Sequence, residues 1–127
     1  MDGTIIDAMS GSVLRPLVRE TFTAVHKLGE AVVLWSAGGA EYARRKANER
    51  GVDQLVTDYF SKTTRTDDGR FDASAITAVY DVVCFVDDLP TDAPSSHELI
   101  RVNPYLGSSP HDSGLAVVLR RVARASA

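Results

Sequence analysis

The sequence predicts an α/β fold, a three-layer, Rossmann-like arrangement in which helices flank a parallel sheet. Two runs, residues 31–35 (AVVLW) and 82–86 (VVCFV), are apolar on both faces, which is typical of buried parallel strands. Segments with helical periodicity alternate with these runs along the chain. That alternation is typical of strands joined by helical crossovers within one parallel sheet. In such sheets, functional side chains gather at the carboxyl ends of the strands.

Composition favours a single globular domain over residues 1–127. Hydrophobic residues make up 44% of the chain and charged residues 24%, both near the averages for globular proteins, so a disordered chain is not expected. The net charge of −3 gives no electrostatic support for a nucleic-acid or membrane partner. The chain has no apolar run as long as the ~20 residues of a membrane span and no signal-like leader. We therefore expect a soluble, cytoplasmic protein in which the single cysteine, Cys84, is a buried hydrophobic residue.

The first helix and the first strand are predicted between residues 16 and 36. Apolar residues recur there at spacings of three and four, which marks the buried stripe of a helix: Val18, Phe22, Val25 and Leu28. Pro16 suits the first turn of this helix, and Gly29 suits its end. The strand at 31–35 follows, and the turn 36–39 (SAGG) closes it.

Shorter elements are predicted in the middle of the chain. A second helix is expected from about Ala40 to Arg50, with Gly51 as its stop. Residues 55–56 then form a brief strand, and residues 63–69 are polar and loop-like.

The last part of the chain repeats the alternation of helix and strand. A helix is expected over residues 72–80 from the spacing of its apolar residues, followed by the strand at 82–86. Residues 99–102 form a weaker strand, and a closing helix begins at Asp112 or Ser113 as its cap.

Four polar features fall next to the predicted strands: Asp2, Ser36, Lys62 and the pair Asp87–Asp88. Ser36, Lys62 and the acidic pair each have a structural alternative, namely a serine that caps a turn, a solvated lysine and a solvated acidic loop. In a functional interpretation, the Ser36 hydroxyl and the following backbone N–H groups hold phosphate oxygens near a helix start. Lys62 is placed to neutralise a phosphoryl group.

The adjacent Asp87 and Asp88 are the strongest local signal. Two carboxylates that close an apolar strand repel one another, and a hard divalent cation with oxygen ligands relieves that repulsion. Asp92 either adds a further ligand or begins the next turn. A divalent metal ion is therefore expected at this strand end.

Taken in order, Asp-Gly-Thr, strand-Ser, Lys and strand-Asp-Asp resemble the motifs of the haloacid dehalogenase-like (HAD) phosphohydrolase superfamily, whose first motif is Asp-x-Asp-Gly-Thr. Asp2, Ser36, Lys62 and Asp87 are separated by 34, 26 and 25 residues, which suits a small member of that family. The resemblance covers the whole chain. It implies a HAD-like fold without a cap domain, because the intervals in which relatives insert a cap are too short here.

The resemblance also implies roles for single residues. In this family the first Asp of the motif attacks phosphorus and forms an aspartyl-phosphate, while the second protonates the leaving group and then activates water. Asp2 matches the second Asp, the acid/base, and a catalytic role is also implied for Lys62. Phosphate binding is implied for Ser36, Ala37 and Lys62, and binding of the cofactor Mg²⁺ for Asp2, Asp87 and Asp88. Which of the two adjacent aspartates touches the metal stays open.

The nucleophile position falls immediately before Met1, and the strand that carries it in the family falls there too. Three explanations are open: an internal Met taken as the start of a longer chain, a degenerate relative that binds phosphate, metal or a partner without turnover, or a fragment or other family. The printed chain is expected to have little phosphatase activity. Its folded form then needs residues upstream, strands paired across a homo-oligomer, or closure of the gap between the neighbours of the absent strand.

A capless site is open, which by family resemblance implies a phosphorylated substrate that is bulky or macromolecular, or a partner that closes the site. Residues 14–43 and 82–90 look most like capless phosphatases that act on phosphorylated polymerase tails. A purely structural or interaction role has only Trp35 in its favour, and Trp35 is expected in the core. The identity of the substrate is not encoded in these motifs.

Overall fold

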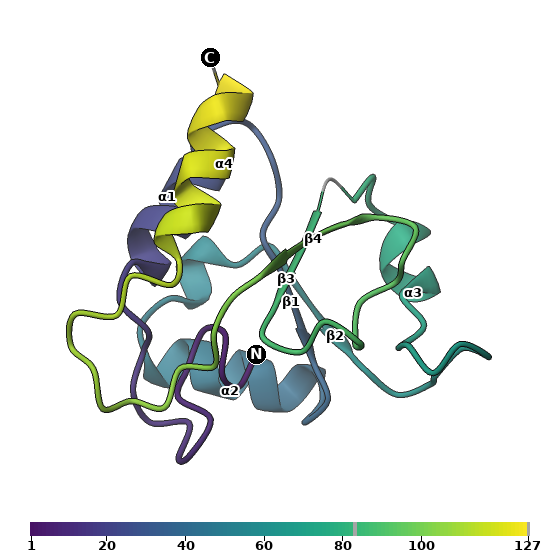
Figure 1. The fold of residues 1–127 in the computed structure, drawn as a ribbon, viewed down its shortest axis with the longest axis horizontal. Coiled ribbons are helices and arrows are strands. Elements are labelled where there is room, and N and C mark those ends of the chain that lie inside the picture. The colour runs from purple at the N-terminus through teal and green to yellow at the C-terminus, as the bar shows by residue number, and fades with distance from the viewer. Residues whose placement is uncertain (83, 127) are drawn as a thin grey trace.

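The computed structural model describes residues 1–82 and 84–126, and these residues form an α/β fold of short parallel strands and helices (Figure 1). The helices of the described chain are α1 (Val18–Lys27), α2 (Ala40–Glu49), α3 (Ser74–Thr77) and α4 (Ala116–Ser126), with a single 3-10 turn, η1 (Asp53–Leu55). Its strands are β1 (Val33–Ser36), β2 (Asp58–Ser61), β3 (Cys84–Asp87) and β4 (Glu98–Arg101). The α/β class predicted from the sequence is confirmed.

The strands form two separate parallel pairs. β1 pairs with β2 from Val33↔Asp58 to Ser36↔Ser61, and β3 pairs with β4 from Cys84↔Glu98 to Asp87↔Arg101. β1 and β3 are not paired with one another. The described residues therefore do not form a single continuous sheet. Direct pairing of β1 with β3, one of the arrangements expected from the sequence, is not observed among them.

Helix α1 follows the predicted apolar stripe but begins later than Pro16. Leu17 has a φ of 74°, a left-handed conformation, so regular helix starts only at Val18. Val18 and Phe22 are buried on the inner face, and Gly29, with a φ of 78°, follows the helix end as predicted.

The predicted strand at 55–56 is wrong. The N–H groups of Leu55 and Val56 bond back to the carbonyls of Val52 and Asp53, which makes a 3-10 turn instead. Pairing with β1 starts only at Thr57, whose N–H donates to the Val32 carbonyl at 2.7 Å, and β2 follows directly.

The later elements lie close to their predicted positions, with shifted ends. α3 is a single turn rather than a helix over 72–80, and the closing helix begins at Ala116. The strand predicted at 82–86 is observed as β3, although Val83 lies outside the described residues. The weaker strand at 99–102 is observed as β4, one residue earlier.

Helices cover the strands on different flanks. Figure 1 shows α1 and α4 side by side on one flank and α3 on the opposite one, and α2 packs against β1 and β2. The buried hydrophobic cluster joins the first residues of the chain to these elements: Met1, Ile5, Ile6, Val18, Phe22, Val32, Leu34, Ala43, Ala47, Val52, Ile100, Val102, Leu115 and Val118. Cys84 and Trp35 are only half-buried, contrary to the sequence expectation. None of the helices among the described residues is long and apolar enough to cross a membrane.

Candidate functional site

The charges of four side chains act on the amino group of Met1. The chain folds back at once, because the Met1 carbonyl accepts the N–H groups of Thr4 and Ile5 at 3.2 and 2.9 Å. The amino group is thereby buried, and burial followed by the nearby charge of Lys62 lowers its pKa. The carboxylates of Asp2, Asp87 and Asp88 act on the same amino group. The structure therefore brings the charged residues singled out in the sequence to one place.

Lys62 is a buried cation rather than a solvated one, with 7% of its surface exposed. Its Nζ lies 2.8 Å from Oδ2 of Asp87 and 3.5 Å from Oδ2 of Asp92. The ammonium group also lies 5.1 Å from the centre of the Trp35 ring. Asp92 is thus a second partner of Lys62, a role that the sequence left open.

The two adjacent aspartates have opposite electrostatic environments. Burial raises the pKa of Asp87, but the hydrogen bond from Lys62 and the N–H of Leu89 outweigh it and hold that pKa below the ordinary value of 3.8. Burial, and then the neighbouring carboxyl of Asp87, raise the pKa of Asp88. Lys62 therefore satisfies Asp87, while the charge on Asp88 remains poorly compensated.

Asp88 packs against the turn that begins with Asp2. Its Oδ1 accepts the Thr4 hydroxyl at 3.1 Å, and its own N–H donates to the same hydroxyl oxygen at 3.2 Å. Gly3 has a φ of 80°, and a Cβ at Gly3 would lie 2.5 Å from Oδ2 of Asp88. Two residues of the Asp-Gly-Thr sequence therefore make this contact: Gly3 allows the close approach, and Thr4 bridges to Asp88.

Asp2 itself is exposed and lies against helix α2. The Tyr42 hydroxyl contacts Oδ1 and Oδ2 of Asp2 at 2.9 and 3.1 Å. Burial, followed by this hydrogen bond, raises the pKa of Tyr42 to about 12. Tyr42 also crowds Gly38, because a Cβ there would lie 2.8 Å from the tyrosine ring. The absence of a side chain at Gly38, in the turn at residues 36–39, thus leaves room for Tyr42, which holds Asp2.

Ser36 is buried at the end of β1 and is joined to Lys62 through the backbone. Its carbonyl accepts the Lys62 N–H at 2.8 Å, and its hydroxyl accepts the Gly38 N–H at 3.1 Å. Among the described residues, the Ser36 hydroxyl proton has no acceptor. Ala37 is exposed in the turn that leads into α2. This turn therefore lies beside the site, with one hydroxyl proton available to a ligand.

The buried side chain of Arg15 holds the loop that contains Asp2 in place. It is 1% exposed, and its guanidinium donates to the carbonyls of Gly3 and Asn103 at 3.2 and 2.7 Å. The Asp112 carboxylate accepts a hydrogen bond from Nε of Arg15 at 2.8 Å and neutralises its buried charge. Asp112 therefore pairs with this arginine, and the regular turns of α4 begin only at Ala116.

The predicted carboxylates are near one another but do not form a ready metal centre. In the described part of the chain, no three His, Cys, Asp or Glu side chains are grouped so that they could hold an ion. Asp2 is held by Tyr42, Asp87 by Lys62 and Asp88 by Thr4. The donor chemistry, carboxylate oxygen with one uncompensated charge, suits Mg²⁺. Binding would require the side chains of Asp2 and Asp88 to exchange their present partners.

Three residues contribute to the site beyond those that the sequence predicts. Thr4 lies within the Asp-Gly-Thr motif, and its position there is the signal that could identify it. Tyr42 lies in the first turn of the helix that follows Ser36, which is a weak signal. Arg15 carries no such signal, since arginines are mostly exposed.

Comparison with known proteins adds no assignment. The chain matches no protein-family model and no curated protein sequence. The chemistry of the site is therefore interpreted from its own residues.

Proposed function

We propose that this site binds a phosphomonoester together with Mg²⁺, as a HAD-like phosphohydrolase does, and hydrolyses it where an aspartate stands immediately before Met1. The observation that supports the proposal is that Lys62 bonds to Asp87 at 2.8 Å, and that the adjacent Asp88 packs against the turn that begins with Asp2. Ser36 lies alongside, tied to Lys62 by its carbonyl. These are the groups that phosphoryl transfer needs, namely hydrogen-bond donors for the oxygens, a cation and an acid/base.

Different residues of the chain would bind the phosphate and the metal. The Ser36 hydroxyl and the backbone N–H groups from Ala37 onward hold phosphate oxygens, and Lys62 neutralises their charge. Asp88 and Asp2 would hold Mg²⁺, with Asp87 supporting them, because Lys62 already engages Asp87. When bound, Mg²⁺ supplies positive charge for the phosphoryl oxygens.

The reaction proceeds in two displacement steps. A carboxylate oxygen of the residue before Met1 attacks phosphorus, the bond from phosphorus to the leaving oxygen breaks, and Asp2 gives that oxygen its proton. Water then attacks phosphorus, Asp2 takes the proton, and the carboxylate and free phosphate are released. No electrons are exchanged. A phosphorylated macromolecule or other bulky substrate suits the exposed position of Asp2 and Ala37.

Binding without turnover is the second candidate function of the 127-residue chain. The observation in its favour is that Ser36, Lys62 and the Asp87–Asp88 pair lie together at the strand ends and need no nucleophile to bind phosphate or metal. Calorimetry of the chain with Mg²⁺ and inorganic phosphate tests whether the chain binds these ligands. We expect heat from both additions, and heats no larger than dilution would contradict both candidates.

Extending the chain tests hydrolysis directly. A variant with an apolar segment and an aspartate placed before Met1 is expected to hydrolyse p-nitrophenyl phosphate in the presence of Mg²⁺. Asp2→Asn and Asp88→Asn should each abolish that activity. Asp67→Asn, an exposed aspartate in the loop before α3, is the matched control and should leave it unchanged. Activity that survives Asp2→Asn and Asp88→Asn would show that the proposed roles are wrong.

A further inference from the structure

The side chain of Tyr42 is packed between two glycines that belong to different loops. A Cβ at Gly38 would lie 2.8 Å from Cδ1 of the tyrosine ring, which is closer than a side chain can approach. A Cβ at Gly11 would lie 3.2 Å from the tyrosine hydroxyl, and Gly11 itself is buried. The absence of side chains at both glycines leaves room for the phenol, so its hydroxyl has a defined position beside Asp2.

This hydroxyl contacts both oxygens of the Asp2 carboxylate. The distances to Oδ1 and Oδ2 are 2.9 and 3.1 Å, and a phenol has one proton to donate, so the two oxygens share it. Among the described residues, Tyr42 is the only hydrogen-bond donor to this carboxylate. One side chain therefore sets the direction in which the exposed carboxylate of Asp2 points.

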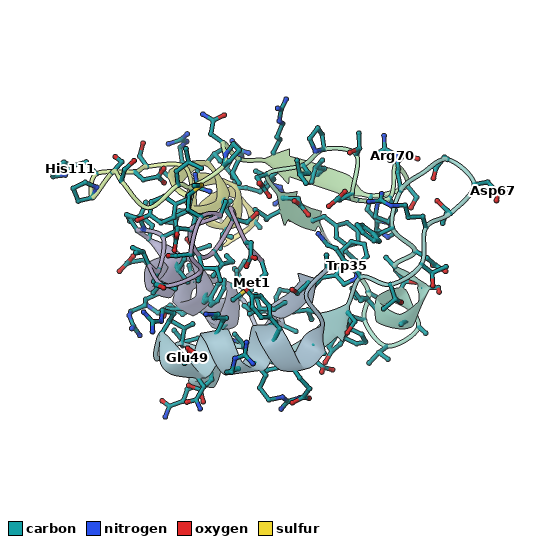
Figure 2. All side chains as sticks on the ribbon, turned by 90° about the horizontal axis from the view of Figure 1, so that it is seen from below. Met1, Trp35, Glu49, Asp67, Arg70 and His111 are labelled. Atoms are coloured by element: carbon teal, nitrogen blue, oxygen red, sulfur yellow. The ribbon has the colours of Figure 1, made fainter. Side chains whose placement is uncertain are left out.

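Helix α2 provides the support for this contact. Figures 1 and 2 both show the start of the chain, at Met1, beside α2, and Met1 shares the buried cluster with that helix. Two cations of α2 lie close to the tyrosine ring: Cζ of Arg45 is 5.6 Å and Nζ of Lys46 is 5.8 Å from the ring centre. The contact therefore ties the turn at Asp2 to a regular helix through a restrained ring.

The same contact holds Asp2 apart from the second proposed metal ligand. Asp88 packs against Gly3, the residue after Asp2, so the two carboxylates belong to adjoining parts of the backbone. Asp2 is nevertheless bound to Tyr42 and Asp88 to Thr4, and the carboxylates of the described residues are not grouped around a common point. A cation held by both would need carboxylate oxygens that face one another. To face Asp88, the Asp2 carboxylate must turn away from Tyr42 and lose its hydrogen bond.

We propose that Tyr42 is a positioning residue that latches Asp2 in the metal-free site, so that Mg²⁺ must break the Tyr42–Asp2 bond in order to bind. This inference rests on the proposed function, from which it takes Asp2 and Asp88 as the residues that hold the ion. Removing the hydroxyl frees the Asp2 carboxylate to turn, and Mg²⁺ then binds more tightly. A merely structural role for Tyr42 predicts no such gain, because loss of the hydroxyl could only loosen the site.

Calorimetric titration of the full chain with Mg²⁺ alone tests the latch. Tyr42→Phe keeps the ring beside Gly38 and removes only the hydroxyl. Its affinity for Mg²⁺ should exceed that of the unsubstituted chain by roughly three- to tenfold, which corresponds to one net hydrogen bond. Tyr80→Phe is the matched control, because the Tyr80 hydroxyl also bonds to an aspartate, Asp58, at 3.0 Å, at the other end of β2 from the site. That variant should bind Mg²⁺ as the unsubstituted chain does.

The same comparison in an Asp2→Ala background shows whether the effect acts through Asp2. With no carboxylate to release, Tyr42→Phe should leave the affinity of that variant unchanged. A gain that persists with Asp2→Ala would overturn the latch. An affinity of Tyr42→Phe equal to or below that of the unsubstituted chain would also overturn it, while leaving the proposed metal site in place. Heats no larger than dilution in every variant would contradict the proposed function itself, and the latch with it.

Discussion

Replacing Arg15 by methionine should destabilise the whole fold. The side chain of Arg15 is fully buried, and its hydrogen bonds join the loop at Gly3 to the carbonyl of Asn103 and to Asp112. The Gly3 carbonyl keeps a second donor, the N–H of Tyr105 at 2.8 Å, so its loss is partial. The main loss falls on Asn103 and on Asp112, whose side chain is 19% exposed and would lack its counter-ion.

Breaking a buried ion pair from one side costs about 3–5 kcal/mol, and the partial compensation at Gly3 points to the lower end, about 3 kcal/mol. For a chain of 127 residues this corresponds to a fall in melting temperature of roughly 10–15 °C. Arg19→Met is the matched control, because Arg19 also donates to two backbone carbonyls but is exposed. Its cost should stay within about 0.5 kcal/mol. Equal shifts for the two variants in urea unfolding and thermal melting would refute the account of Arg15 as the buried anchor of the loop.

Three further predictions concern the first residues of the chain. Burial raises the pKa of Asp7, but N–H and O–H donors outweigh it and hold that pKa well below 3.8, so stability should fall as pH drops below about 4. In Asp7→Asn, urea unfolding at pH 5 and pH 3 should show a smaller loss of stability, and an unchanged loss would contradict this account. Thr4→Val should cost about 1–3 kcal/mol in urea unfolding, because the Asp88 carboxylate and N–H lose their shared hydroxyl, and a near-zero change would argue against that bridge. Gly3→Ala should destabilise by at least about 1 kcal/mol more than Gly29→Ala, since both have positive φ but only Gly3 contacts a neighbour, and equal melting temperatures would exclude that steric effect.

Local sequence signals predicted the elements that local residues control. Helix α2 matches its predicted start at Ala40 and ends one residue before Arg50, because Gly39 and Gly51 break the helix on either side with φ values of 104° and 72°. The position of β2 was missed, because its residues become a strand only through their register with β1. Strand positions depend on partners distant in sequence, whereas helix ends depend on neighbours.

The same distinction applies to the site. The rule that functional groups lie at strand ends predicted the neighbourhood of Ser36, Lys62 and Asp87. It did not predict that Lys62 would be buried between two carboxylates, because the pairing with Asp92 depends on how the loop after β3 folds back. Nor did it predict Tyr42 on Asp2, a contact across 40 residues of sequence.

These pairings bear on how the proposed site would act. Asp2, Asp87, Asp88 and Asp92 carry four negative charges, against which the cluster sets Lys62, the Met1 amino group and Arg65, which lies 3.9 Å from Asp92. A phosphate group entering this cluster would meet excess negative charge, and Lys62, already engaged by two carboxylates, offsets little of it. A divalent cation on Asp88 and Asp2 would reverse that balance without disturbing the Lys62–Asp87 pair. Under the proposed function, metal and phosphate therefore depend on one another energetically, and the affinity for each should rise in the presence of the other.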